Sequence, residues 1–308
     1  MTDHLHDLII IGGGPAGLAA GIYAARDGLD CILLESRTPG GQLANTAGIA
    51  NYPGFPGEVS GFELAEKMRE QAVAFGLKIE EGEARGLARD GARIRVECAA
   101  GAHEARAVVV ATGATRRRLG VPGEDRLGGR GVSYCGTCDG PLFRDMRVVV
   151  AGGGDTAVEE AVFIARFASR VTIVHRRDRL RASPGLQRRV FAEKKIDFCW
   201  GSVIREIRGE GRVSGVLVGD ARGGGVREIP CEGVFIFVGS TPNTAFLKGA
   251  LALDEAGCVV ADITMATSLP GVFAAGDARR DSVRQIAAAV GDGVTAVIQA
   301  ERYLGARG

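Results

Sequence analysis

Two stretches of the chain share one pattern of apolar and polar positions. In each, a short apolar run is followed by glycines, a stretch with helical periodicity and a second apolar run. The first stretch comprises residues 7–17, 18–25 and 31–34, and the second comprises residues 147–157, 158–168 and 171–174. Each pattern predicts a β-α-β unit of the kind that opens a dinucleotide-binding domain.

The remaining runs outline the parts around these two units. An amphipathic helix is predicted for residues 61–75 and a long helix for residues 287–303. Short alternating runs between about 78 and 110 predict a small antiparallel sheet. Buried strands are predicted for residues 108–113 and 271–275. Residues 116–123 and 239–243 resemble linkers. We therefore predict an α/β protein with two Rossmann-like dinucleotide-binding domains, the second inserted into the first. Residues 1–115 and 244–308 form the first domain, and residues 116–243 form the second.

Composition narrows the class of protein. The 308 residues are 46% hydrophobic and 24% charged, with a formal net charge of +1, so the chain lacks the strongly basic balance of a nucleic-acid binder. No apolar run approaches the roughly 18 residues that a membrane span needs. The first run, Leu8 to Ile11, is too short for the core of a signal peptide, so we expect a cytoplasmic protein.

The first glycine loop predicts a nucleotide site with an acidic ribose contact. Gly12, Gly14 and Gly17 follow a predicted strand and open a predicted helix, the context in which this motif binds a pyrophosphate. Glu35 lies at the end of the second strand, where a carboxylate accepts hydrogen bonds from ribose hydroxyls and repels a 2′-phosphate. This loop therefore favours FAD or NAD. The structural alternative is a glycine turn that only packs helix on strand.

The second glycine loop predicts a site for a phosphorylated ribose. Gly152, Gly154 and Ala157 repeat the motif, with alanine as the permitted third residue. The position that matches Glu35 begins the run His175-Arg176-Arg177, with Arg181 nearby, and guanidinium groups bind a 2′-phosphate well. This loop therefore favours NADP, and the alternative is a solvated basic turn. Two such sites indicate electron transfer between two cofactors, with flavin plus NADPH as the economical pair.

Cys135 and Cys138 form a C-x-x-C followed by Asp139. This spacing indicates a redox dithiol, and Asp139 is placed to move a proton when a disulfide opens or closes. A zinc site needs a second pair of ligands, and the four histidines are scattered along the sequence, so no metal is expected. A purely structural pair stays possible. The other five of the seven cysteines resemble small core residues.

Taken together, these motifs resemble the low-molecular-weight, prokaryotic-type thioredoxin reductases over essentially the whole chain. The resemblance implies an FAD- and NADPH-dependent homodimer that reduces thioredoxin. Cys138 would face the flavin, Cys135 would attack the thioredoxin disulfide and Asp139 would act as acid and base. Arg130 lies where members contact thioredoxin, and Pro141-Leu142-Phe143 stands where many members carry consecutive aromatic residues in the docking loop.

The resemblance also implies the cofactor-binding residues. For FAD they are Gly12, Gly14, Pro15, Ala16, Gly17, Glu35, Gly41, Gln42, Leu43, Asn51, Thr112, Gly113, Asp277, Arg284, Gln285 and Ala287. For NADPH they are Gly152, Gly154, Asp155, Thr156, Ala157, His175, Arg176, Arg177 and Arg181.

Four other functions compete with this interpretation. A reductase component for peroxiredoxins usually carries an N-terminal thioredoxin-like extension, whereas here the first predicted strand lies close to residue 1. A small-molecule dithiol oxidase would use oxygen, and a ferredoxin–NADP reductase relative would not need the C-x-x-C. A non-catalytic redox sensor would have little reason to keep both cysteines, Asp139 and two complete nucleotide sites.

Overall fold

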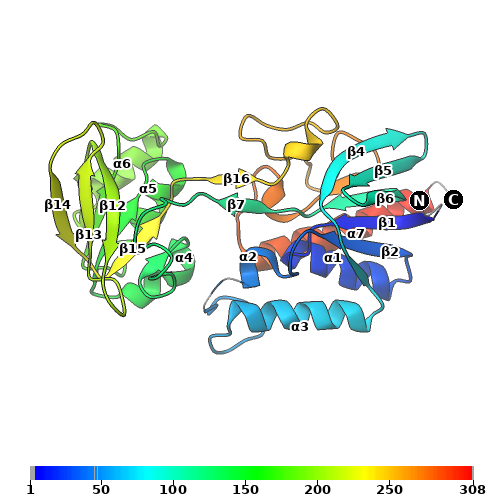
Figure 1. Cartoon of the computed structure of the whole chain (residues 1–308), viewed down its shortest axis with the longest axis horizontal. Coiled ribbons are helices and arrows are strands. Elements are labelled where there is room, and N and C mark those ends of the chain that lie inside the picture. Colours follow the sequence, from blue (N-terminus) through cyan, green and yellow to red (C-terminus); the bar gives the residue numbers. More distant parts are fainter. Residues whose placement is uncertain (1–3, 45, 47, 307–308) are drawn as a thin grey trace. The chain divides into compact units, whose positions relative to one another are not determined.

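A computed structural model describes residues 4–44, 46 and 48–306. The chain divides into two compact units (Figure 1). Unit 1 comprises residues 1–115 and 241–308, and unit 2 comprises residues 116–240. The chain passes between them through β7 (Ala114–Arg116) and β16 (Ser240–Pro242), which pair with each other. The assignment of FAD to one unit and NADPH to the other stays a prediction.

Unit 1 is built on a seven-stranded sheet with the order β3-β2-β1-β6-β5-β4, in which β17 also pairs with β6. The strands are β1 (Leu5–Ile11), β2 (Cys31–Glu35), β3 (Lys78–Glu81), β4 (Ala84–Asp90), β5 (Arg93–Cys98), β6 (Gly101–Val110) and β17 (Val272–Ala274). The start of β6 pairs with β5 in the antiparallel sense, and its end pairs with β17 in the parallel sense. The small antiparallel sheet predicted from the sequence is thus an extension of the main sheet.

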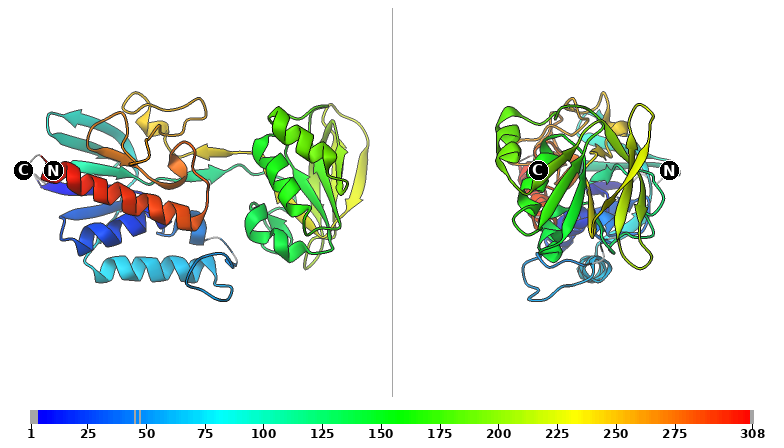
Figure 2. Two further views of the ribbon diagram at one scale, coloured as in Figure 1. Left: turned by 180° about the vertical axis from the view of Figure 1, so that it is seen from behind. Right: turned by 90° about the vertical axis from the view of Figure 1, so that its left-hand side faces the viewer.

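Helices cover one face of this sheet. They are α1 (Pro15–Arg26), α2 (Gly41–Ala44), α3 (Gly61–Ala74) and α7 (Ile286–Gly305), and α1 packs between α3 and α7 (Figure 2). Leu8 and Ile10 of β1 point into this layer, whereas Ile9 and Ile11 point to the opposite face. That face is covered by β4 and β5 and by the segment with the short helix η2 (Ala245–Leu247). The second half of β1, Leu8–Ile11, is apolar because both of its faces are buried.

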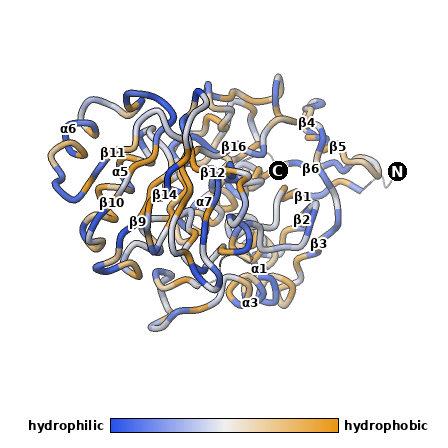
Figure 3. Tube along the Cα trace, turned by 60° about the vertical axis from the view of Figure 1, so that its left-hand side comes forward, coloured by the Kyte–Doolittle hydropathy of each residue, from blue (hydrophilic) through white to orange (hydrophobic). Residues whose placement is uncertain are grey.

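Unit 2 has the same layering. Its parallel sheet has the order β11-β10-β9-β15-β8, made of β8 (Val132–Ser133), β9 (Arg147–Ala151), β10 (Arg170–Val174), β11 (Ile196–Cys199) and β15 (Gly233–Ile236). Helices α5 (Asp155–Ile164) and α6 (Pro184–Ala192) cover one face. A second sheet of β12 (Ser202–Arg208), β13 (Gly215–Asp220) and β14 (Val226–Pro230) covers the other. The apolar segments follow these central strands in Figure 3.

The structure confirms both predicted β-α-β units and moves several boundaries. The first helix begins at Pro15 instead of Leu18, and the second spans Asp155–Ile164 instead of residues 158–168. Both helices begin directly after the third of three consecutive glycines, Gly14 in unit 1 and Gly154 in unit 2, which are their N-cap residues. The chain turns after Ile164, although Ala165 and Ala168 are still apolar and buried. No helix in the described part of the chain is long and apolar enough to cross a membrane.

Candidate functional site

The glycine loop of unit 1 leaves an open backbone surface at the start of α1. Gly12 adopts a φ of +105°, and a Cβ atom there would lie 2.5 Å from the carbonyl oxygen of Ala111. A Cβ atom on Gly17 would lie 1.8 Å from the oxygen of Gly12, so the third glycine is required for helix and strand to meet. Gly14, by contrast, faces open space and caps α1 without a side-chain hydrogen bond. The first amides of α1 are therefore available to an anionic group.

Glu35 holds the tip of β2 against this loop. Its Oε2 atom accepts a 2.6 Å hydrogen bond from the backbone N–H of Gly13, and Oε1 accepts one of 2.9 Å from the N–H of Arg37. The N–H of Gly40 donates to the oxygen of Gly13 at 2.7 Å, and Gly41 lies against Gly14. The predicted acid thus lies at the loop, as the sequence indicated.

A second group of predicted FAD residues lies next to the loop. The hydroxyl of Thr112 is buried and has no hydrogen-bond partner among the described residues. Its neighbour Gly113 accepts a hydrogen bond from the backbone N–H of Asn243. The segment with Gly276 packs against Ala16, so Asp277 is also close to the start of α1. An unpartnered buried hydroxyl beside an open phosphate cradle fits a bound nucleotide cofactor.

The remaining predicted FAD residues differ in position. Gln42 donates from Nε2 to the oxygen of Ala114, and Asn51 donates to Gln285 at 3.3 Å, so these side chains connect the segments around the loop. The Leu43 side chain is buried in the main core, and the predicted contact of this residue with FAD stays a prediction. Arg284 and Ala287 are exposed. Their connection to the other predicted FAD residues is their position beside Gln285, the N-cap of α7.

Unit 2 repeats the loop with a different partner at the strand tip. Gly152 has a φ of +149°, and a Cβ atom there would lie 2.5 Å from the oxygen of Phe237. The ring of His175 takes the place of Glu35: a Cβ atom on Gly153 would lie 2.5 Å from it. The N–H of Arg181 donates to the oxygen of Gly153 at 2.8 Å. The Arg181 guanidinium lies 3.7 Å from the position that a Cβ atom on Gly154 would take.

The charges at this second loop suit a phosphate. Arg176, Arg177 and Arg181 are exposed, whereas His175 is buried and its Nε2 has no partner among the described residues. Burial lowers the pKa of His175, and the charges of Arg177, Arg181 and Arg176 lower it further. Asp155 accepts a 2.7 Å hydrogen bond from the N–H of Ser183 and so fixes the chain after the arginines. An electropositive cradle with an unsatisfied imidazole nitrogen fits the 2′-phosphate of NADP.

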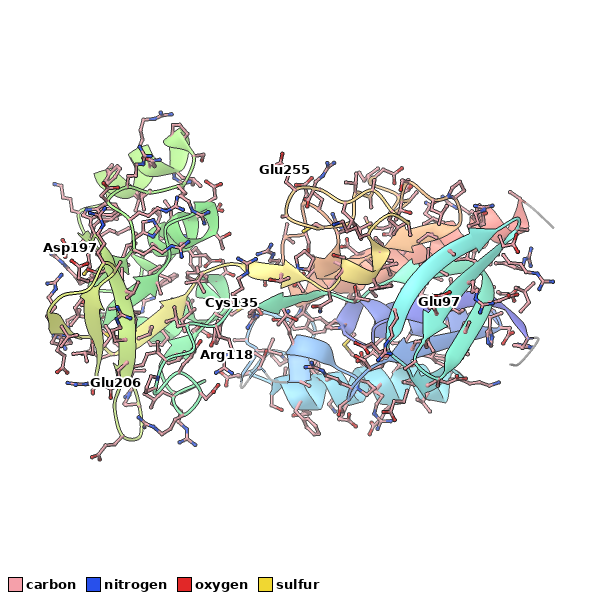
Figure 4. The ribbon with its side chains drawn as sticks, turned by 45° about the horizontal axis from the view of Figure 1, so that its top comes forward. Glu97, Arg118, Cys135, Asp197, Glu206 and Glu255 are labelled. Carbon is pink, nitrogen blue, oxygen red and sulfur yellow. A yellow bond between two sulfur atoms is a disulfide. The ribbon has the colours of Figure 1, made fainter. Side chains whose placement is uncertain are left out.

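Cys135 and Cys138 are joined by a disulfide in unit 2 (Figure 4). Cys135 is the N-cap of the short helix α4 (Gly136–Asp139), and its sulfur accepts a 3.1 Å hydrogen bond from the N–H of Cys138. The five other cysteines are free. Burial raises the pKa of the Cys231 thiol to about 12 and that of Cys31 to about 11, so neither competes as a thiolate.

Ser133 is a residue of this centre to which the sequence analysis gave no role. It is buried at the end of β8, and its hydroxyl donates a 2.5 Å hydrogen bond to Oδ2 of Asp139. The Oγ atom of Ser133 in turn accepts a 3.1 Å hydrogen bond from the N–H of Cys135. Ser133 therefore joins the carboxylate to the first cysteine. The only sequence signal was a serine at the end of a strand just before the C-x-x-C.

Tyr134 anchors the same segment from the other side. Its hydroxyl donates a 2.6 Å hydrogen bond to Glu124, a buried carboxylate that also accepts hydrogen bonds from the N–H groups of Leu119 and Gly120. Burial works against the charge, yet these hydrogen bonds hold the pKa of Glu124 below its usual value. Burial and the neighbouring carboxylate raise the pKa of Tyr134 to about 12. The backbone before Cys135 is thus tied down at two successive residues.

The structure brings two of the histidines together with a carboxylate that is distant in the sequence. His4 and His6 are not isolated, because both lie beside Asp30 at the start of β2. His4 Nε2 is 2.6 Å and His6 Nδ1 is 3.3 Å from Asp30 Oδ2. His4 and His6 are two residues apart, so both side chains can lie on the same side of an extended chain. Asp30 is far from them in the sequence, so their proximity to it was not evident from the sequence.

The comparisons with known proteins agree with this picture. The profile of the family described as pyridine nucleotide-disulphide oxidoreductase matches residues 6–293. A protein from Listeria monocytogenes named thioredoxin reductase is 46% identical over 98% of this chain and 95% of its own length. One of the same name from Streptomyces clavuligerus is 47% identical over 99% of this chain and 96% of its own. The crystal structure of thioredoxin reductase from Streptococcus pyogenes, 45% identical, covers 99% of this chain and 100% of its own with a TM-score of 0.94.

The chain therefore belongs to the pyridine nucleotide-disulphide oxidoreductase family and, within it, to the prokaryotic-type thioredoxin reductases. It is an NADPH-dependent disulfide oxidoreductase, and its cofactors are FAD and NADPH. The predicted fold class is confirmed as well. The two cradles fit these cofactors, since one has a carboxylate at the strand tip and the other has arginines.

Proposed function

We propose that this enzyme reduces the disulfide of thioredoxin with electrons from NADPH. The observation that carries the proposal is the Cys135–Cys138 disulfide, which lies in the same unit as the arginine-bearing loop and has Asp139 directly beside it. The names of the relatives supply the partner: each of those described above is called thioredoxin reductase. Cytoplasmic localisation and a homodimer form part of the same proposal.

The two units divide the work. Unit 1 would hold FAD with the loop from Gly12 to Gly17, with Glu35 available to the ribose and Asp277 close to the start of α1. Unit 2 would hold NADPH with the loop from Gly152 to Ala157 and the cationic strand tip. A bound FAD would supply the chemistry that connects the two-electron donor NADPH with the disulfide.

Each residue of the redox centre has a separate role in the reaction. Opening the Cys135–Cys138 bond takes up two electrons and two protons and leaves two thiols. Asp139 delivers a proton, and the Ser133 hydroxyl keeps its carboxyl oriented towards the cysteines. Cys135, as the attacking thiolate, forms a mixed disulfide with thioredoxin. Cys138 displaces reduced thioredoxin from it, which restores the internal disulfide.

The docking surface for thioredoxin includes Arg130 and the segment from Pro141 to Phe143. Leu142 is 61% exposed in this segment, whereas Phe143 is buried against Phe235. An exposed aliphatic side chain next to the redox pair suits a partner that buries its own apolar surface around a disulfide.

The test is an anaerobic thiol count. NADPH is added to the holoenzyme with oxidised thioredoxin from the same organism, and new thioredoxin thiols are counted against NADPH consumed. We expect two thiols per NADPH for the wild type and for Cys98→Ser, which changes an unpaired, half-buried cysteine of unit 1. Cys138→Ser should abolish them. NADPH oxidation that needs oxygen and yields no thioredoxin thiols would instead identify a dithiol oxidase and overturn the proposed partner.

The homodimer and the localisation have their own tests. Light scattering of the holoenzyme should give twice the mass of one chain, and cell fractionation should recover the protein with the cytoplasm. A single-chain mass at micromolar concentration would remove the dimer from the proposal, and recovery outside the cytoplasm would remove the localisation.

A further inference from the structure

Glu160 is a half-buried carboxylate that no step above uses. It lies on α5, which packs against α4, and its Oε2 atom is buried without a hydrogen-bond partner in the described part of the chain. A Cβ atom on Gly136 would lie only 2.2 Å from that oxygen. The carboxylate therefore lies directly against the backbone between the two redox cysteines.

The surroundings of Glu160 offer little compensation for a negative charge. Burial raises the pKa of its carboxyl group, and the backbone N–H groups of Thr137 and Gly136 counteract part of this rise. No arginine, lysine or histidine pairs with it among the described residues, although surface carboxylates of the same unit such as Glu232 and Glu228 have arginine partners. A buried, unpaired carboxylate costs stability. Its place beside the redox pair gives it an electrostatic effect on that pair.

We propose that Glu160 is a positioning residue that tunes how easily the Cys135–Cys138 disulfide is reduced, an inference that rests on the proposed redox role of this pair. The disulfide is neutral, whereas the reduced pair releases a proton to form the thiolate that attacks the partner. A carboxylate held against Gly136 disfavours this thiolate, because like charges in a poorly solvated site repel. Glu160 therefore keeps the pair strongly reducing and ready to pass its electrons on.

Gly136 has no side chain and so leaves the space that the Glu160 carboxylate occupies. Any side chain at this position meets the carboxylate and also approaches Ile164, whose Cδ1 lies 3.0 Å from the position of the Cβ atom. Since the nearest atom is the end of a flexible side chain, an alanine here would push the carboxylate away without breaking the backbone. Gly136→Ala should therefore weaken the effect of Glu160.

The experiment measures the redox equilibrium of the pair in the FAD-loaded enzyme without NADPH or thioredoxin. Wild type and Glu160→Gln are equilibrated with glutathione buffers at about pH 9.5, above the ordinary thiol pKa of about 8.5, so that the reduced pair is present largely as thiolate. Free thiols are then trapped, and the peptide with Cys135 and Cys138 is quantified by mass spectrometry. We expect the equilibrium constant for reduction to rise about fivefold in Glu160→Gln, or about 20 mV towards a more oxidising pair. The matched control Glu159→Gln, an exposed carboxylate one residue away, should stay within about twofold of the wild type.

Gly136→Ala provides a second test if Glu160→Gln does not fold. It should shift the equilibrium in the same direction, and it should add nothing in a Glu160→Ala background. An unchanged constant in Glu160→Gln or Gly136→Ala, a shift of the opposite sign, or an equal shift in Glu159→Gln would overturn the inference. A failure here would leave the thioredoxin thiol count intact, because the titration uses neither of the two substrates. Failure of the thioredoxin proposal would likewise leave this equilibrium measurable.

Discussion

The two units place the same backbone device in two different chemical settings. In each, the first glycine has a positive φ and approaches a carbonyl oxygen of the neighbouring parallel strand segment, Ala111 in unit 1 and Phe237 in unit 2. In each, the middle glycine lies against the tip of the second strand, which carries Glu35 in one unit and His175 in the other. We therefore expect the loop to fix where the phosphates lie and the strand tip to select the ribose.

The outer strands extend the comparison. β17 in unit 1 and β8 in unit 2 each pair in parallel with the strand that neighbours the first strand of the β-α-β unit, which is β6 and β15 respectively. β17 comes from the end of the chain and leads to Asp277, whereas β8 comes before its β-α-β unit and leads through Ser133 to the disulfide. One position in the sheet thus delivers a carboxylate in unit 1 and a dithiol in unit 2.

Removing the cations of unit 2 should have the largest effect on this contrast. Arg176→Ala combined with Arg177→Ala should raise the Kd for NADPH at least about 100-fold, since a hydrogen bond to a charged group contributes about 1.5–3 kcal/mol. The Kd for NADH should change less than about threefold. Trp200 is the single tryptophan, 6.4 Å from the His175 ring, so its fluorescence can follow the titration. Equal losses of affinity for both nucleotides would show that the arginines do not bind the 2′-phosphate. Arg189→Ala on α6 is the control.

Exchanging the third loop residue should have the next largest effect. Gly17→Ala places a Cβ atom 1.8 Å from the oxygen of Gly12, so we expect a loss of about 3 kcal/mol in the stability of unit 1 and release of FAD. The reciprocal change Ala157→Gly in unit 2 should cost only about 0.5–1 kcal/mol. Thermal unfolding and flavin content per chain would measure both. An equally mild effect of the two substitutions would mean that the loops are packed alike.

Loss of the Ser133 hydroxyl should have a moderate effect on the redox centre. Ser133→Ala removes the hydrogen bond to Asp139 and leaves the N–H of Cys135 without that acceptor, so thioredoxin reduction should slow about tenfold, equivalent to about 1.4 kcal/mol. The pH profile of kcat should shift as well, because the environment of the acid changes. Ser214→Ala, an exposed serine of the same unit, is the control. An unshifted profile with an unchanged rate would remove Ser133 from the centre.

The titration of His175 should have the smallest effect. Burial and three arginines lower its pKa in the folded state, so below about pH 6.5 the unfolded chain binds a proton that the folded chain does not. The stability from His175 is therefore complete above that pH and decreases as the pH falls. Between pH 7.5 and 5.5 the nucleotide-free wild type should lose about 2–4 °C more in Tm than His175→Gln. His103→Gln in unit 1 should behave as the wild type, and equal pH dependence in all three would contradict the assignment.

Much of the fold could be predicted from the sequence. The β-α-β units follow from local periodicity and glycine spacing, and α3 and α7 were found within two residues at each end. The antiparallel strands were predicted but not their fusion with the main sheet, because β6 changes partner along its length. Pairing of this kind depends on contacts between distant segments, which no local pattern encodes.

The candidate site shows the same division. The two glycine motifs, Glu35, the arginines and the C-x-x-C with Asp139 were evident from residue types at fixed spacing, since each interacts mainly with its own loop. Ser133 and Glu160 were given no role. A serine and a glutamate have no distinctive spacing, and their importance arises from what the fold places next to them.

The sequence by itself thus determined that the chain has two nucleotide cradles of opposite charge and one redox pair, because these are local patterns of glycine, charge and sulfur. Only the tertiary structure decided which groups surround that pair. The hydroxyl that donates to Asp139 belongs to Ser133 on β8. The carboxylate that lies against Gly136 belongs to Glu160 on α5. Burial and hydrogen bonding are properties of packed segments, so the electrostatics of the dithiol is set only when the strands and helices of unit 2 have packed together.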